Sequence, residues 1–415
     1  MAQPSLKRNA FALVTMQAIN YLVPLITLPY LTHTLGVEQY GALNLALSLI
    51  QYGILFVTFG FNLSTTQYIA RHRHQPLLVS RAFWETMVAK LWLLIIACIV
   101  LTTITLSVEN FQQIKWLVFI LFLQLLSVAI DPLWLFQGIE RLETISIIGS
   151  VIRLLNIPLL FIFVHSSDDV NYAVTIQSVL LLSTALINLC LVYKTKIVVV
   201  KYKQLKIIQA LRLSLPLFVG TAAISLYNTS TPLILGLVNS YEEVGIYAAS
   251  FRIQGAAIGI FTVLGQVLYP RVNHLFSQSY EEGYLFIKKI LFGMFPILLV
   301  SSIVFYLLVP VVPWLLGDQF DNTVSTLRIM SPFIFIIPYC VVFANCILLP
   351  LGYKKIYFML PICLGVIHVF YSTILSYYFG AVGASYSILL TEVMNFIILF
   401  ILVLYKTDLN HYLRW

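Results

Sequence analysis

The sequence FWETMVAKLWLLIIACIVLTTITLS, residues 83–107, holds two charged residues in its first eight positions and none in the seventeen that follow. A bilayer core about 30 Å thick requires about 20 apolar residues in helical form, so this stretch predicts a membrane-spanning helix. The whole chain agrees, because its 415 residues are 60% hydrophobic and 10% charged, against roughly 25% charged in soluble proteins. We therefore predict an all-α polytopic membrane protein and exclude a soluble enzyme, a disordered chain and a disulfide scaffold.

Eleven further apolar runs of similar length lie before and after this stretch. The twelve predicted transmembrane helices cover residues 10–31, 42–62, 83–107, 116–136, 147–164, 172–193, 213–238, 246–269, 290–309, 325–349, 356–378 and 385–405. Nineteen Lys and Arg residues fall in loops on the side of the N-terminus, and Lys115 alone falls on the other side. By the positive-inside rule both termini are predicted to be cytoplasmic. The net charge of +8 therefore reflects topology, and we expect no nucleic acid as a partner.

The longest basic connection, residues 194–212, follows the sixth span and predicts two six-helix lobes, residues 1–193 and 213–415. An internal repeat supports this division, because residues 41–51 can be placed on residues 245–255. Both halves begin on the same side of the membrane, so we predict a parallel duplication around a central cavity. The lysines of the connection could lie along the membrane surface or bind anionic membrane lipids.

Polar and small side chains recur at helical spacing in the second and eighth predicted spans, in register between the two. They are Asn44, Ser48, Gln51, Thr58 and Asn62 in the second span, and Arg252, Gly255, Gly259, Thr262 and Gln266 in the eighth. We predict that each set forms one helix face toward the cavity, where Gln51, Asn62 and Gln266 contact substrate. Close helix packing through small residues is the alternative explanation for the glycines.

Seven charged residues lie within or at the edges of the predicted spans, where an unpaired charge costs about 2.5 kcal/mol or more. They are Lys90, Arg153, Arg252, Arg328, Glu85, Asp131 and Glu392. Arg153, which shares a helix face with Asn156, and Arg252 are predicted to be cavity cations that bind substrate, and Lys90 is the third candidate. Arg328 lies near a span end and is predicted to anchor the helix at the interface. Glu85 is predicted to pair with Arg81, four residues before it.

Asp131 and Glu392 have no base three or four residues away in their own helix. Each must find a partner in another helix or be protonated. A carboxyl group that alternates between these states would couple transport to protons or sodium, whereas a static interhelical ion pair explains the same residues. His368 also has two interpretations: it could carry protons, or it could be a buried histidine held by hydrogen bonds. The sequence holds no Walker loop and no metal-spaced His/Cys cluster, so we expect no cofactor.

Several segments, in this order along the chain, resemble one family. They are Asn20-Tyr-Leu-Val-Pro-Leu-Ile-Thr-Leu-Pro-Tyr30-Leu31, Leu35-Gly36, Tyr40-Gly41, Trp134-Leu-Phe-Gln-Gly-Ile-Glu140, Val244-Gly-Ile-Tyr247, Pro350-Leu-Gly352 with Lys354-Lys355, Gly380-Ala-Val-Gly383-Ala and Thr391-Glu392. Together they resemble the polysaccharide transporter family, and within it the O-antigen repeat-unit flippases (Wzx type). This family lies in the multidrug/oligosaccharidyl-lipid/polysaccharide exporter superfamily.

The resemblance implies a flippase of the bacterial inner membrane. Such a protein moves an undecaprenyl-pyrophosphate-linked oligosaccharide from the cytoplasmic to the periplasmic leaflet by alternating access of two lobes. It also implies a polysaccharide polymerase and glycosyltransferases as partners, and Glu392 matches an acid common at that place in the family. The residues fit this substrate on physical grounds as well, because arginine binds phosphate through a bidentate fork.

Two other functions stay open. A cation-coupled multidrug exporter of the same superfamily would share the twelve spans, but cavity arginines are unsuited to cationic drugs. A membrane polysaccharide polymerase would need a sizeable extramembrane loop for its catalytic residues, and every predicted outer loop is short. The sequence therefore favours a transporter over an enzyme.

Overall fold

The computed structural model describes residues 6–198 and 205–409, and every regular element within these two ranges is a helix. The predicted all-helical class is therefore correct. Eight helical segments of the described chain, some of them containing a kink, are long and apolar enough to cross a membrane. The count of twelve membrane-spanning helices stays a prediction.

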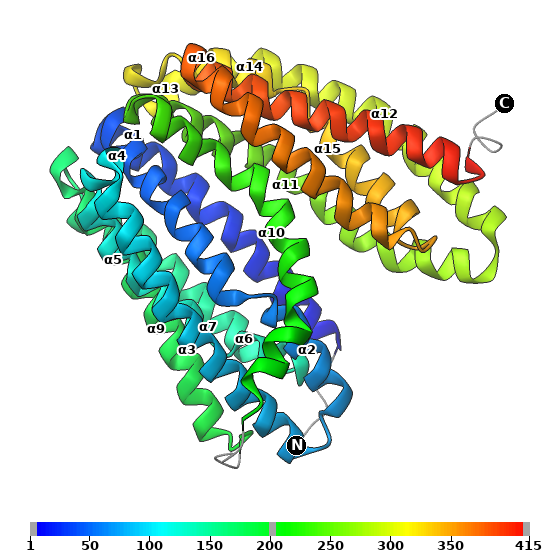
Figure 1. Ribbon diagram of the computed structural model, residues 1–415. Helices are drawn as coiled ribbons and strands as arrows, with labels where there is room; N and C mark the ends of the chain where they lie inside the picture. Colours follow the sequence, from blue (N-terminus) through cyan, green and yellow to red (C-terminus); the bar gives the residue numbers. More distant parts are fainter. Residues whose placement is uncertain (1–5, 199–204, 410–415) are drawn as a thin grey trace. The chain divides into compact units, whose positions relative to one another are not determined.

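The chain divides into two compact units, Met1–Ala222 and Ala223–Trp415. The helices of the first unit are α1 (Leu6–Thr58), α2 (Phe61–His72), α3 (Pro76–Ser107), α4 (Glu109–Gln112), α5 (Lys115–Ile130), α6 (Leu133–Gly138), α7 (Glu143–Leu154), α8 (Asn156–Phe163), the 3-10 turn η1 (Ser167–Asp169), α9 (Val170–Lys194) and the first part of α10 (Ile207–Val238). Helices α1, α3, α5 and α9 lie side by side (Figure 1), and α7 packs against α1 and α9.

The start of α10 packs on the first unit. The Ser214 hydroxyl of α10 lies 2.7 Å from the Ser64 hydroxyl of α2, and the Phe218 ring stacks on Phe59 with 4.5 Å between ring centroids. Residues 199–204 of the predicted linker lie outside the described residues. The predicted lobe and linker boundaries therefore stay predictions.

The segment Trp134–Glu140 carries the most specific part of the family resemblance, and it packs α6 against α2 and α3. The Trp134 side chain is 1% exposed, and its ring lies 5.9 Å from the Phe83 ring of α3. A Cβ atom on Gly138 would lie 2.7 Å from a side-chain atom of Ile69 in α2. A larger residue at Gly138 would therefore push α6 away from α2.

Two backbone interruptions with positive φ shape the first helices of the chain. Helix α1 contains a non-helical Gly36 with φ 72°, and it ends at Thr58 because Phe59 and Gly60 adopt positive φ of 43° and 73°. The prediction of one continuous helix over residues 42–62 is therefore wrong. Asn62 lies in α2, so helical spacing does not place it on the face of Gln51.

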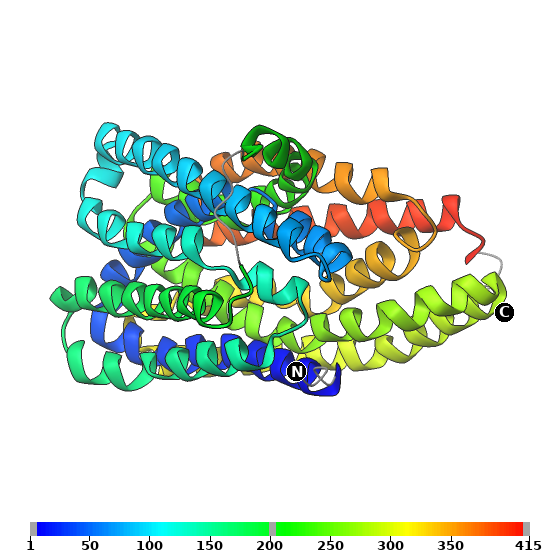
Figure 2. The same cartoon turned by 90° about the horizontal axis from the view of Figure 1, so that it is seen from below.

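The second unit contains the rest of α10 and several helices that pack in pairs. They are α11 (Tyr241–Gln278), α12 (Tyr280–Leu308), the 3-10 turns η2 (Val309–Val311) and η3 (Asp318–Phe320), α13 (Val312–Leu316), α14 (Thr323–Met330), α15 (Phe333–Val341), the π-helix η4 (Val342–Leu348) and α16 (Lys354–Lys406). Figure 2 shows α11 and α12 running side by side, as their packing contacts require.

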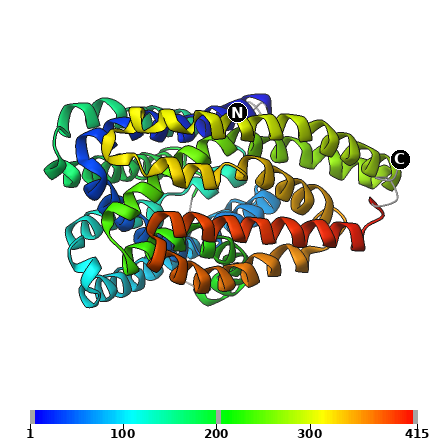
Figure 3. The ribbon, with the colours of Figure 1, turned by 90° about the horizontal axis from the view of Figure 1, so that it is seen from above.

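Helix α16 is two helices joined at Gly380, which has φ 54° and ψ −136°. The two halves lie against each other (Figure 3), and hydrogen bonds join them. The Glu243 carboxylate of α11 accepts a hydrogen bond from the Ala381 N–H, at the start of the second half. A Cβ atom at Gly380 would collide with that carboxylate, so both the backbone angle and the close approach require glycine.

Candidate functional site

Lys90 is enclosed within the first unit, although it was predicted to be a cavity cation. Its side chain is 1% exposed, and its Nζ donates a hydrogen bond of 3.0 Å to the Val128 carbonyl near the end of α5. In a continuous helix that carbonyl would accept the N–H of residue 132, but Pro132 has no N–H. The Lys90 ammonium therefore supplies the donor that Pro132 lacks.

Asp131 lies at the same break, between α5 and α6. Its Oδ1 accepts hydrogen bonds from the Leu133 N–H at 3.1 Å and from Asn188 Nδ2 of α9 at 3.0 Å. It also lies close enough to Lys90 for an electrostatic attraction. The structure thus brings two predicted site residues, Lys90 and Asp131, together inside one unit. Three helices, α3, α5 and α9, meet at this pair of opposite charges.

Arg153 lies in the last turn of α7, and its side chain is half-buried. Leu155 separates α7 from α8, which begins at Asn156. The Asn156 side-chain oxygen is buried and has no hydrogen-bond partner among the described residues. A buried polar atom normally has a partner, so this oxygen marks a place where water or a ligand group would be stabilised. Arg153 and Asn156 belong to different helices, so their common face stays a prediction.

Arg252 lies in α11 with its side chain half-buried. Gly255, from the same predicted stripe, lines a cavity of about 140 Å³ in the second unit, together with Gln254 of α11 and Glu392 of α16. The structure thus brings one predicted stripe position and Glu392 to the same cavity. Among the described residues that line this cavity, Arg252 is absent, so its predicted contact with substrate stays a prediction.

Glu392 is buried, with 6% of the residue exposed. It also borders a second cavity of about 280 Å³, which Asn345 and Asn395 line with it. Asn345 lies in the π-helix η4, and π-helical turns often occur at functional sites because they change which side chains face a cavity. Cys340 and Tyr371 lie close enough to Glu392 to interact with it electrostatically.

His368 is fully buried in a hydrogen-bonded network beside Glu392. Its Nε2 lies 3.0 Å from the Thr231 hydroxyl of α10, and its Nδ1 lies 2.7 Å from the Thr391 hydroxyl in the second half of α16. The Tyr371 hydroxyl also bonds to Thr391. Hydroxyl groups can donate or accept, so this network accommodates either tautomer of the imidazole. Thr231 and Tyr371 were not predicted, because no sequence pattern relates them to His368.

Gln51 and Asn62, two further predicted substrate contacts, lie on different helices of the first unit. Gln51 in α1 and Asn62 in α2 are exposed, and the break at Phe59 separates their helices. Gln266 lies in α11, but its side chain is outside the described part of the structure, so its predicted contact stays a prediction. Among the other stripe positions, Asn44 is buried and donates to the Tyr40 carbonyl at 2.7 Å.

The surface of the described chain identifies the class of protein. Large apolar side chains such as Trp92, Phe292 and Val366 are 59%, 48% and 61% exposed, whereas Lys90 and Glu392 are buried. Such an arrangement suits a lipid environment, because exposed apolar side chains face hydrocarbon there. The molecule is a multi-pass helical membrane protein.

Solved structures share this fold. The lipid II flippase MurJ in an inward closed conformation superposes with a TM-score of 0.72 at 13% identity, covering 96% of this chain and 87% of that chain. An inward-facing multidrug resistance MATE transporter of the MOP superfamily gives 0.61 at 17% identity, covering 95% and 100%. At this level of identity the comparison establishes a MurJ- and MATE-like transporter fold.

Sequence comparison gives the family. The model of the family described as "Polysaccharide biosynthesis protein" matches residues 6–276. A relative from Escherichia coli (strain K12) is 32% identical over 94% of this chain and 94% of its own length, and one from Shigella dysenteriae is 30% identical over 96% and 99%. Both are named "Putative O-antigen transporter". The chain belongs to the polysaccharide biosynthesis protein family, and the resemblance seen in its sequence is confirmed.

Proposed function

We propose that this protein is a flippase for a lipid-linked oligosaccharide, namely an O-antigen or related polysaccharide repeat unit on undecaprenyl pyrophosphate. The observation that carries the proposal is the nearly full-length similarity to two relatives whose names describe O-antigen transport. The fold shared with a lipid II flippase supports the same chemistry, because that protein also moves a lipid-linked substrate. The relatives are transporters, so the protein is a transporter rather than an enzyme.

The proposed direction is from the cytoplasmic to the periplasmic leaflet of the bacterial inner membrane. Nineteen basic residues on one predicted side against Lys115 on the other support cytoplasmic termini. In the proposed mechanism, two lobes alternate access while Arg153 and Arg252 hold the pyrophosphate in turn. Asn156, Gln51, Asn62 and Gln266 would contact sugar hydroxyls. The proposed partners are a polysaccharide polymerase and the glycosyltransferases that build the repeat unit.

Deletion of the gene tests this function. The mutant is expected to lose its surface polysaccharide and accumulate lipid-linked repeat units, and a plasmid copy is expected to restore both. Silver-stained gels of surface polysaccharide and mass spectrometry of the lipid fraction provide the measurements. Increased drug sensitivity with intact polysaccharide would instead support the multidrug exporter and contradict the flippase.

Ion coupling through Glu392 is a finer part of the proposal. Glu392 is buried at the border of two cavities and has a hydrogen bond with Asn395, so we propose that it alternates between a neutral, protonated form and a charged form that binds a cation. Replacement by glutamine fixes a neutral side chain of the same size. Transport by Glu392→Gln, measured in vesicles with imposed pH and sodium gradients, is expected to lose most of its dependence on one of the two gradients.

Glu281→Gln provides the control, because Glu281 is an exposed acid in the first turn of α12. This variant is expected to keep the dependence of the wild type on both gradients. A Glu392→Gln protein with unchanged dependence would show that Glu392 serves a static, structural interaction.

A further inference from the structure

The first unit contains a polar cavity that is not lined by Lys90, Asp131, Arg153 or Asn156. Its volume is about 220 Å³, and it lies between α2, α3 and the start of α10. Its lining includes two cations, one acid and several hydroxyl groups, among them Ser64, Tyr68, Arg81, Glu85, Lys206 and Ser214. Arginine, lysine and hydroxyl groups are the groups that bind phosphate in proteins.

Glu85 connects α3 to the residue that precedes α10. Its Oε1 accepts hydrogen bonds from Arg81 Nε at 2.9 Å and from the backbone N–H of Lys206 at 2.9 Å. The Arg81 pair forms as its spacing predicts, whereas the contact with Lys206 spans 121 residues of sequence. Because Lys206 bonds Glu85 through its backbone, the side-chain ammonium is not needed for that contact.

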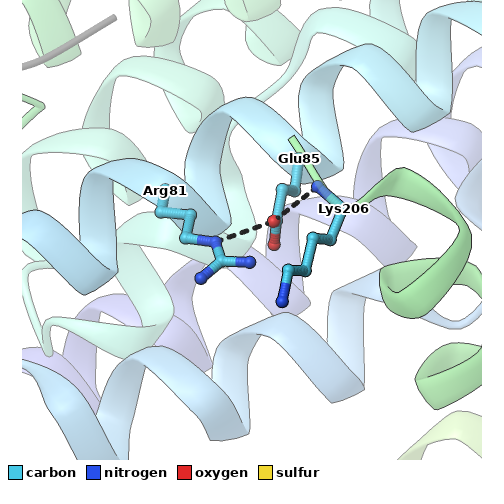
Figure 4. A network of polar contacts seen from close by, with 3 residues as sticks. All are labelled: Arg81, Glu85 and Lys206. Carbon is cyan, nitrogen blue, oxygen red and sulfur yellow. Dashed lines mark hydrogen bonds and ion pairs between the residues drawn. The ribbon is translucent and has the colours of Figure 1, made fainter. Parts of the chain in front are cut away.

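Two cations line the cavity with Glu85. Figure 4 shows the Glu85 carboxylate between Arg81 and Lys206, with a contact to each of them. Two positive charges and one negative charge leave the cavity with an excess of one positive charge. The side-chain exposure of Arg81 is 29%, against 15% for Glu85, so the cation is more accessible to a ligand than the acid that orients it.

Hydroxyl groups complete the polar wall. Ser64 and Ser214 lie 2.7 Å apart between α2 and α10, and Thr65 and Thr86 lie 3.0 Å apart between α2 and α3. These pairs join the helices that form the cavity, so they keep its shape. Hydroxyls can donate to phosphate oxygens as well as to each other.

An exposed apolar side chain borders the cavity. Leu213 of α10 lines it and is 65% exposed. A free phosphate ion gains nothing from such a border. A phosphate attached to a hydrocarbon chain does, because its tail can remain against apolar surface while its head enters the polar cavity.

We propose that this cavity binds the pyrophosphate head of the lipid-linked substrate, as a second site separate from Arg153 and Arg252. The proposal rests on the proposed function for the identity of the substrate. Lys206 and Arg81 bind the phosphate oxygens, and Glu85 positions both the guanidinium and the start of α10. Since α10 runs from the first unit into the second, an occupied cavity holds the beginning of the helix that connects them.

Binding of farnesyl pyrophosphate to the full-length protein in phosphatidylcholine nanodiscs tests the site. Lys206→Gln removes the ammonium and keeps the backbone N–H that bonds Glu85, so the fold is preserved. Its Kd, measured by microscale thermophoresis, is expected to rise about tenfold, the size of one lost charge-assisted contact. Lys289→Gln is the matched control, because Lys289 is an exposed lysine of α12, and its Kd is expected to equal the wild-type value.

The remaining arms identify the ligand. Inorganic phosphate and phosphatidylglycerol are expected to compete weakly with farnesyl pyrophosphate. An equal Kd for wild type and Lys206→Gln would overturn the site, and equally strong competition by phosphatidylglycerol would overturn its assignment to pyrophosphate. Binding is measured independently of surface polysaccharide. Intact polysaccharide in the deletion mutant would therefore contradict the flippase without affecting the Lys206 result.

Discussion

Replacement of Arg153 or Arg252 by alanine is expected to abolish complementation of the deletion mutant at normal expression. Each arginine is half-buried in a helix of a different unit, and each is proposed to bind the pyrophosphate in turn. Loss of a charge-assisted, bidentate contact costs about 1.5 to 3 kcal/mol, which corresponds to about a tenfold to a hundredfold loss in binding. Lysine variants at the same positions keep the charge and are expected to retain part of the function, because lysine cannot form the bidentate fork.

Arg328→Ala is the control for this prediction. Arg328 is exposed in α14, and its guanidinium lies 5.3 Å from the centre of the Tyr306 ring, as an interfacial anchor would. The variant is expected to support normal surface polysaccharide, with membrane levels of every variant compared by immunoblot. Full complementation by Arg153→Ala or Arg252→Ala would remove that arginine from the proposed mechanism.

The sequence predicts the helices well and their interruptions poorly. Residues 83–107 are predicted to form a span, and they form the greater part of α3, because an uninterrupted apolar run leaves the backbone no alternative to helical hydrogen bonds. The same rule fails at Phe59, which has φ 43°, because apolar composition alone does not show that the helix ends where Gly60 follows with φ 73°. The break at Asp131 and Pro132 has a local signal, because proline cannot donate the hydrogen bond that a continuous helix requires.

In the candidate sites too, contacts between residues close in the sequence can be predicted, whereas contacts between distant residues cannot. The Arg81–Glu85 pair is one helical turn apart, so spacing alone predicts it. Lys206 joins Glu85 from a distance of 121 residues, and Thr231 joins His368 from a distance of 137 residues. Sequence identifies residues that need a partner, since a buried charge is costly, but it does not identify which distant residue the fold supplies.

Lys90 is expected to stabilise the helix break at Pro132. Lys90→Met removes the donor to the Val128 carbonyl and the positive charge near Asp131 while keeping an unbranched side chain of similar length. The variant is expected to lose about 3 kcal/mol of stability, because the Val128 carbonyl loses its donor and the partly buried Asp131 carboxylate loses the nearby positive charge. A lower midpoint of thermal unfolding, followed by tryptophan fluorescence in detergent, provides the measurement.

A double-mutant cycle separates this structural role from the substrate contact that the sequence suggested for Lys90. Asp131→Asn makes the acid neutral and keeps an oxygen for Leu133 and Asn188. If the two charges stabilise each other, the Lys90→Met/Asp131→Asn protein loses less stability than the sum of the single variants, by about 1 kcal/mol or more. Lys289→Met, at an exposed lysine, is expected to leave the midpoint unchanged. If Lys90 serves substrate instead, Lys90→Met keeps the wild-type midpoint and weakens binding of farnesyl pyrophosphate, and the two losses of stability are then additive.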